Sequence, residues 1–169
     1  QTSFFAFDEP FFAGGVYVAA ADTNDDGFDD VVVGAGAGGG PRVQVYAGSA
    51  TGLVTSSTLN DFFAYSSAFT GGVVVAAGDR NADGDSEVIT APASNGGFNI
   101  KSFDVNGNGN SPTLVDNFFA FNDTTSVGGL SLAVGFFDFT NIADLVVGTT
   151  NSAFGVFLDS DTSGIATVP

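Results

Sequence analysis

The chain is organised around the stretch Asp22-Thr23-Asn24-Asp25-Asp26-Gly27-Phe28-Asp29-Asp30-Val31-Val32-Val33. The alternating segment Val16-Tyr17-Val18 comes before it, and alternation of this kind is typical of a half-buried β-strand. The valines at its end form a short continuous apolar run, as in a strand that is covered on both faces. The sequence therefore predicts a β-hairpin whose connecting loop is crowded with carboxylate and amide oxygens.

The surroundings of this hairpin repeat along the chain. The glycine pairs Gly14-Gly15, Gly71-Gly72 and Gly128-Gly129 follow one another at a constant offset, and one aromatic signature precedes each pair. The copies of the signature are Phe4-Phe5-Ala6-Phe7, Phe62-Phe63-Ala64-Tyr65 and Phe118-Phe119-Ala120-Phe121. Because short strands and turns follow one another within each period, we expect an all-β fold of three four-stranded antiparallel blade-like repeats, of the β-propeller type. The repeats span residues 8–61, 66–117 and 122–169 of a single domain, and the third is degenerate.

The phase of the repeat indicates a circular permutation. Residues 122–169 contain no aromatic signature after their third strand, whereas residues 1–8 carry one ahead of the first unit. We therefore expect the N-terminal strand, with Phe4, Phe5 and Phe7 as its assembly residues, to fill the vacancy in the last blade. Strand exchange between chains would do this by adding a strand to an open sheet edge.

The charge and composition exclude several classes of function. Three Lys or Arg residues stand against 19 Asp or Glu, which gives a net charge of −16. Nucleic acid and anionic membrane surfaces both need basic patches, so neither is an expected partner. No apolar run approaches the length of roughly 18 residues that a membrane-spanning helix needs, and membrane insertion is not expected. The chain has no His and no Cys. It therefore cannot build the usual nucleophilic triads, and we do not expect an enzyme.

Two loops carry the spacing of a calcium site. In the first, Asp22, Asn24 and Asp26 stand at positions 1, 3 and 5, Gly27 at position 6, and Asp30 at position 9. Hard cations such as Ca²⁺ take six to eight oxygen ligands, and the carbonyl of the position-7 residue, Phe28, supplies a further one. The second loop offers Asp79, Asn81, Asp83 and Glu87, with the carbonyl of Asp85. The alternative is that both are ordinary Asp-Gly hairpin turns with solvated acids.

The third copy of the loop has lost this pattern. Aligning Leu145 with Val31 puts Phe136 at position 1, Asp138 at position 3, Thr140 at position 5 and Asp144 at position 9. We expect no tightly bound ion there, and we expect Phe136-Phe137 to pack in the core. Two further acidic stretches, residues 104–110 and 159–163, are interpreted as turns. Asn122 begins an Asn-Asp-Thr sequon.

These sequences resemble the FG-GAP (VCBS-type) repeat, in which Gly-Gly-Val-x-Val-Ala-Ala, Asp-x-Asn-x-Asp-Gly-x-x-Asp and Val-Val-Gly-Ala-Gly follow one another. The blades of integrin α-subunit propellers and of bacterial surface repeat proteins are similar. The resemblance implies β-propeller blades with Ca²⁺ in the hairpin loops, a location outside the cytoplasm, and a role in adhesion or assembly. It implies the same ligands, in loops 22–30 and 79–87. The start at Gln1 without a Met also fits a processed secreted protein, or a piece of a longer chain.

Three interpretations of function follow. The first is a structural surface protein that associates with copies of itself, as a filament or a ring, because three blades are too few to close a propeller. The second is a lectin-like module that binds glycans between blades; cell-surface proteins are further candidate partners. The third is a hydrolase that uses paired carboxylates. The chain is alternatively a fragment of a seven-blade propeller, in which self-association would be incidental.

Overall fold

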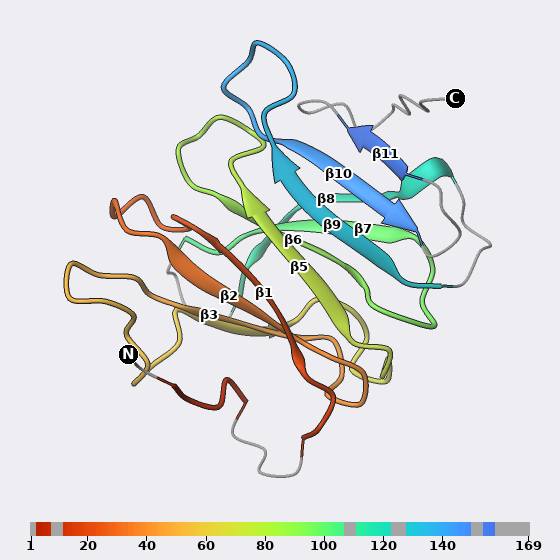
Figure 1. The fold of residues 1–169 in the computed structure, drawn as a ribbon, viewed down its shortest axis with the longest axis horizontal. Helices are drawn as coiled ribbons and strands as arrows, with labels where there is room; N and C mark the ends of the chain where they lie inside the picture. Colours follow the sequence, from red (N-terminus) through yellow and green to blue (C-terminus); the bar gives the residue numbers. More distant parts are fainter. Residues whose placement is uncertain (1–2, 8–11, 107–110, 123–127, 150–153, 158–169) are drawn as a thin grey trace.

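The computed structural model describes residues 3–7, 12–106, 111–122 and 128–149, together with the backbone of residues 154–157 (Figure 1). No helix in this part of the chain is both long and apolar enough to cross a membrane. The described part of the chain forms one short 3-10 helix, η1 (Ala120–Asn122), and eleven β-strands. The strands are β1 (Val16–Ala21), β2 (Asp30–Ala35), β3 (Arg42–Tyr46), β4 (Asn60–Phe63), β5 (Val73–Gly78), β6 (Glu87–Pro92), β7 (Asn99–Asp104), β8 (Thr113–Phe119), β9 (Leu130–Gly135), β10 (Asp144–Thr149) and β11 (Phe154–Phe157).

The strands form three antiparallel sheets, one for each predicted repeat. Sheet 1 has the order β1-β2-β3-β4, sheet 2 the order β5-β6-β7-β8, and sheet 3 the order β11-β10-β9. The predicted all-β antiparallel architecture is confirmed. Two sheets have four strands, as expected, whereas sheet 3 has three among the described residues. No closed propeller is formed by the described part of the chain, and the exchange of strands between chains stays a prediction.

The three sheets pack face to face, and their first strands lie next to one another. Strand β5 contacts β1 on one side and β9 on the other (Figure 1). Alternate residues of β5 therefore enter two different cores. Val73 and Val75 pack with Val32, Val43 and Val45 of sheet 1. Val74 and Ala76 pack with residues of sheet 3, including Leu130, Leu145 and Val147. Since sheet 2 is covered on both faces, its first strand is almost wholly apolar.

Glycine pairs permit the close approach of neighbouring sheets. Gly72 has a φ of 79°, and a Cβ atom there would lie 2.6 Å from the carbonyl carbon of Gly36. A Cβ at Gly71 would lie 1.9 Å from the carbonyl oxygen of Ser94. A side chain at either position would collide with backbone, which explains why this feature of the repeat is a Gly-Gly pair.

Part of the outer face of sheet 1 is covered by the N-terminal segment of the same chain, whereas Val16 and Val18 of β1 on this face are exposed. Phe7 packs with Val33, Ala35 and Tyr46 in a third small core. The described part of the segment, residues 3–7, belongs to no β-strand in this single chain. The segment therefore lies against the face of its own first sheet. That it adds a strand to the last blade of a neighbouring chain stays a prediction, because the structure contains a single chain.

Candidate metal centre

Three loops, each joining the first and second strand of a sheet, carry the candidate metal ligands. The segment 22–29 is loop 1, the segment 79–86 is loop 2 and the segment 136–143 is loop 3. In each sheet the residue before the loop pairs directly with the acid after it, as Ala21 pairs with Asp30. The acids Asp30, Glu87 and Asp144 begin β2, β6 and β10, so position 9 is fixed by the sheet and not by the loop.

Loops 1 and 2 share an unusual backbone conformation. Position 4 is left-handed in both, with a φ of 54° at Asp25 and 62° at Ala82. Position 6 is also left-handed, with a φ of 85° at Gly27 and 104° at Gly84. No atom lies within 4 Å of a Cβ built at either glycine, so the glycine is required by the backbone and not by crowding. No residue of loop 3 has a positive φ.

This conformation turns backbone N–H groups toward the side chain at position 1. The Asp22 carboxylate accepts hydrogen bonds from the N–H groups of Asn24 (3.3 Å), Asp26 (3.2 Å) and Gly27 (2.8 Å). In loop 2, the Asp79 carboxylate accepts from Asn81 (3.3 Å), Ala82 (2.6 Å) and Gly84 (3.2 Å). The position-1 aspartate therefore holds the tip of each complete loop.

Positions 3 and 5 repeat the same pattern on a smaller scale. Asn24 Oδ1 accepts from the N–H of Asp26 (3.1 Å), and Asp26 Oδ1 accepts from the N–H of Phe28 (2.9 Å). The corresponding distances in loop 2 are 2.8 Å from Asp83 N to Asn81 Oδ1 and 3.1 Å from Asp85 N to Asp83 Oδ1. The two predicted sites are thus two copies of one local structure.

The acid at position 9 has a role that the sequence did not reveal. In all three loops it accepts a hydrogen bond from the N–H group at position 2. The distances are 3.1 Å from Thr23 N to Asp30, 2.7 Å from Arg80 N to Glu87 and 2.6 Å from Phe137 N to Asp144. All three acids are buried. Because loop 3 keeps this contact without the other ligands, the position-9 acid closes the loop whether or not a metal binds.

In loop 2 the side-chain amide of one predicted ligand donates hydrogen bonds to the carboxylates of two others. The Nδ2 atom of Asn81 donates to Asp83 Oδ2 at 2.9 Å and to Glu87 Oε1 at 2.8 Å. Burial, together with the charges of Asp83 and Asp79, raises the pKa of Glu87 to about 7. A carboxyl group with this environment is one whose charged form a cation stabilises.

The residues fit a hard cation by donor type and by backbone conformation. Every candidate ligand supplies oxygen, from the side chains of Asp22, Asn24, Asp26 and Asp30 or the carbonyl of Phe28 in loop 1, and from the equivalent groups of loop 2. Many of these side-chain oxygens are engaged by N–H groups of the loop. Among the described residues, no group of three or more Asp, Glu, His or Cys side chains is gathered closely enough to hold an ion.

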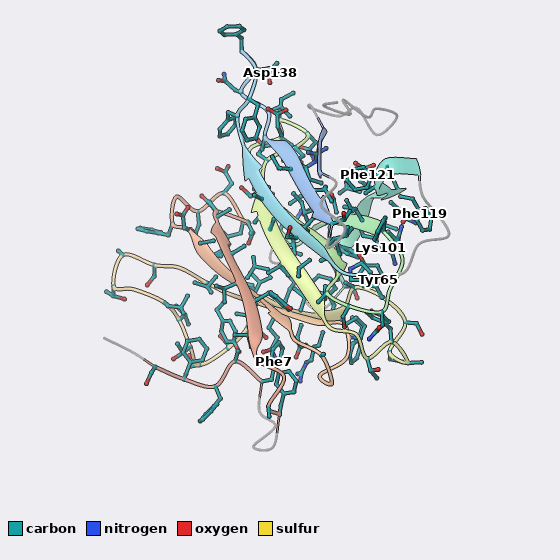
Figure 2. All side chains as sticks on the ribbon, turned by 45° about the vertical axis from the view of Figure 1, so that its right-hand side comes forward. Phe7, Tyr65, Lys101, Phe119, Phe121 and Asp138 are labelled. Carbon is teal, nitrogen blue, oxygen red and sulfur yellow. The ribbon has the colours of Figure 1, made fainter. Side chains whose placement is uncertain are left out.

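Loop 3 departs from the expectation that its phenylalanines are buried. Phe136 and Phe137 are 65% and 60% exposed, and Phe139 is fully exposed. The prediction that Phe136-Phe137 packs in the core is therefore wrong. Figure 2 shows Asp138 at the tip of this loop, which projects beyond β9 and β10. In the preceding loop the position-2 side chain, Arg80, reaches the next loop and donates to the carbonyl of Ala143 (3.3 Å). No next loop is present among the described residues to cover Phe137.

Neighbouring loops are joined by one repeated backbone hydrogen bond. The N–H of Ser86, at position 8 of loop 2, donates to the carbonyl of Asp22, at position 1 of loop 1 (2.9 Å). The N–H of Ala143 donates to the carbonyl of Asp79 in the same way (2.7 Å). The three loops therefore form a ladder along one end of the stacked sheets.

A second repeated feature lies where the aromatic signatures meet the sheets. A cavity of about 310 Å³ is lined by Phe7, Phe12, Ala35, Gly39, Arg42, Asp61 and Phe63. A cavity of about 280 Å³ is lined by the equivalent part of the next repeat, including Tyr65, Phe69, Pro92, Gly96, Asn99 and Phe119. Each has a cation over an aromatic ring nearby. Arg42 lies 5.6 Å from the centre of the Phe7 ring. Lys101 lies 4.8 Å from the centre of the Tyr65 ring, and Figure 2 labels both residues.

The remaining predicted stretches are only partly described. The Asp104 carboxylate accepts from the N–H of Asn106 at 3.0 Å, as in a turn, but residues 107–110 lie outside the described residues. The stretch 159–163 and the end of the sequon, residues 123–124, also lie outside them.

A scan against protein-family models finds no match to this chain, and a search of curated proteins finds no significant relative.

Proposed function

We propose that this chain is a calcium-stabilised extracellular structural or adhesion protein that associates head-to-tail with copies of itself by strand complementation. Its role would not be enzymatic. The observation that carries the proposal is the position of the N-terminal segment. Residues 3–7 lie on sheet 1 in the way that the end of β4 lies on sheet 2, as if they were the last strand of a preceding blade.

Two aromatic contacts correspond residue by residue, and a third contact reaches the equivalent carbonyl from a different position of the third strand. Phe4 packs edge-on against Tyr46 with ring centroids 5.0 Å apart, as Phe62 packs against Phe103 at 5.0 Å. Phe7 and Phe12 make a T-shaped pair at 6.0 Å, and Tyr65 and Phe69 make one at 6.2 Å. The carbonyl of Ala6 accepts from the Tyr46 hydroxyl (2.5 Å), as the carbonyl of Ala64 accepts from Lys101 Nζ (3.0 Å).

One difference identifies what is missing from the single chain. Phe62 is 8% exposed, because the rest of sheet 1 covers it, whereas Phe4 is 40% exposed. The preceding sheet that would cover Phe4 has to come from elsewhere. Sheet 3 of another chain, which has three strands among the described residues, is a partner of the right kind. Repetition of this contact gives a ring where the rotation closes and a filament where it does not.

Calcium enters the proposal as the stabiliser of each hairpin. Loops 1 and 2 share their backbone conformation and their oxygen donors, and they follow the FG-GAP pattern that the sequence resembles. When bound, a hard cation would neutralise acids that lie close together in an acidic chain. Asp26, whose Oδ1 holds the N–H of Phe28, would orient Oδ2 toward the ion. Both oxygens of Asp22 and both oxygens of Asp79 accept loop N–H groups, so these two carboxylates would coordinate through an oxygen that also holds the loop.

The association is tested by sedimentation velocity in calcium over a range of protein concentrations. We expect the wild-type chain to form large species, and we expect both a chain without residues 1–8 and the Phe4→Ser variant to remain small. Phe119→Ser is the matched control, because Phe119 is equally exposed (40%) but lies on β8 within the chain. A wild-type chain that stays monomeric, or a deletion that leaves assembly intact, would overturn the proposal.

The two repeated cavities favour a second candidate function, the binding of glycans between blades. Both contain aromatic rings beside Gly-rich turns, and the first also contains the paired Arg42 and Asp61, with Arg42 Nε 2.8 Å from Asp61 Oδ1. Aromatic faces with a few fixed polar groups suit the apolar and hydroxyl faces of a sugar. A glycan array probed with the wild-type chain and with Arg42→Ala tests this function, and an array without any bound glycan would exclude it.

A further inference from the structure

The ladder of loops ends in two complementary backbone groups. Inside the chain, the position-8 N–H of each loop donates to the position-1 carbonyl of the loop before it, in the pairs Ser86–Asp22 and Ala143–Asp79. Loop 1 has the corresponding N–H at Asp29, and loop 3 has the corresponding carbonyl at Phe136. Neither group has a hydrogen-bond partner among the described residues. The two ends of the ladder are therefore donor and acceptor for the same kind of bond.

The side chains around these two groups are also complementary. Within the chain, Asp85 at position 7 of loop 2 precedes Ser86, whose N–H donates to the carbonyl of Asp22 at position 1 of loop 1 (2.9 Å), so position 7 of one loop lies beside position 1 of the loop before it. At the free ends these positions are aromatic. Position 7 of loop 1 is Phe28, and positions 1 and 4 of loop 3 are Phe136 and Phe139. All three are exposed, Phe28 by 43%.

The sheets behind the loops show the same relation. Val16 and Val18 of β1 are 50% and 65% exposed, whereas their counterparts in β5, Val73 and Val75, are buried against sheet 1. On β9 and β10 of sheet 3, the residues that alternate with the buried ones are small or apolar, with Ala133 paired to Val146 and Ser131 to Gly148. Exposed apolar surface at both ends, matching an interface that occurs twice inside the chain, indicates a contact between the two ends.

We propose that sheet 3 of one chain stacks on sheet 1 of a second copy of this chain, with Phe28 of the second copy packed against Phe136 and Phe139 of the first and the Asp29 N–H bound to the Phe136 carbonyl. This inference rests on the proposed head-to-tail association and names the surface that it uses. The loop 3 phenylalanines then replace a calcium site by an aromatic seam. Aromatic residues of this kind dominate the binding energy of many interfaces.

Disulfide cross-linking tests the seam, because the chain has no cysteine of its own. We expect the double variant Phe28→Cys/Phe139→Cys, oxidised in calcium, to give a series of covalent dimers, trimers and higher multimers on a non-reducing gel. A reducing agent should convert this multimer series back to the monomer. A disulfide requires Cα atoms within about 7 Å, so the multimer series reports close packing of these two positions. Both side chains are in exposed loops, and their replacement leaves the packed core unchanged.

The matched control is Phe28→Cys/Phe119→Cys, in which the second cysteine is exposed but lies on β8. Suppose that the wild-type chain assembles. If Phe28→Cys/Phe139→Cys then gives no multimer series, or the control gives the same multimer series, the proposed seam is wrong and the proposed association stands. If the wild-type chain does not assemble, both fail. In a second measurement, Phe136→Ser/Phe139→Ser should raise the midpoint concentration of assembly about tenfold or more, while Phe119→Ser leaves it unchanged. An unchanged midpoint in the first variant would also overturn the seam.

Discussion

Loops 1 and 3 occupy the same place in the first and third copies of one repeat, yet they differ in almost every side chain outside position 9. Loop 1 has acids or an amide at positions 1, 3 and 5 and a left-handed glycine at position 6. Loop 3 has Phe136, Asp138 and Thr140 at the first three of these positions. Both keep the hydrogen bond from the position-2 N–H to the position-9 acid. The comparison separates residues that close the hairpin from residues that are candidates to bind the metal.

Removal of calcium should have the largest effect on this comparison. If loops 1 and 2 bind the ion in the folded state only, each contributes about 2.7 kcal/mol at a free concentration one hundred times its Kd. We expect EDTA to lower the Tm of the wild-type chain by roughly 10 °C or more, since about 1 kcal/mol corresponds to ~2–4 °C at this size. Differential scanning calorimetry measures the shift, and a Tm unchanged by EDTA would remove the metal from the account.

Replacement of the position-9 acid should cost stability even without calcium. Asp30→Ala leaves the N–H groups of Thr23 and Gly48 and the Thr23 hydroxyl without their acceptor. We expect a loss of about 3 kcal/mol in the free energy of unfolding in EDTA, measured by urea denaturation. Asp144→Ala should also destabilise the chain, although we expect no ion in loop 3. Asp26→Asn serves as the control, with its effect confined to calcium-containing buffer. A loss for Asp30→Ala that appears only in calcium would make Asp30 a ligand and not a closing residue.

Restoring the lost residues of loop 3 should create a third site. The variant Phe136→Asp/Thr140→Asp/Asn141→Gly gives loop 3 the missing acids and the missing glycine. We expect isothermal titration calorimetry to find three calcium ions per chain in place of two, with up to about 2.7 kcal/mol of further stabilisation under the conditions above. Phe136→Asp alone, which lacks the second acid and the glycine, is the comparison variant. A triple variant that still binds two ions would show that oxygen donors and the turn are insufficient.

The smallest expected difference concerns the turn itself. Gly27 has a φ of 85°, so Gly27→Ala should destabilise the chain by about 1 kcal/mol, because an alanine adopts this conformation only under strain. Asn141→Ala in loop 3, where φ is not positive, should change the stability much less. Thermal unfolding of the two variants side by side measures the difference. Equal losses at the two positions would mean that the left-handed turn does not distinguish the loops.

Much of the fold was accessible from the sequence, because strand pattern and repeat period are local properties. The alternation at Val16-Tyr17-Val18 and the apolar run after Asp30 predicted β1 and β2 correctly, and the same pattern predicted their counterparts in the next repeat. Two features depended on neighbours in space. Phe136 and Phe137 look like core residues in sequence but are exposed, because no sheet follows sheet 3 in the described part of the chain. The hydrogen bond from Thr23 N to Asp30 spans the whole loop, and spacing alone assigned that acid only to the metal.

The central claim, that the chain uses its displaced signature to join copies of itself, is tested most directly by negative-stain electron microscopy in calcium. The ring contacts of Phe4 with Tyr46 and of Phe7 with Phe12 match those of Phe62 with Phe103 and of Tyr65 with Phe69. We predict filaments or closed rings of the wild-type chain in calcium and their loss in EDTA. Separate single-chain particles at every protein concentration in calcium would contradict the claim.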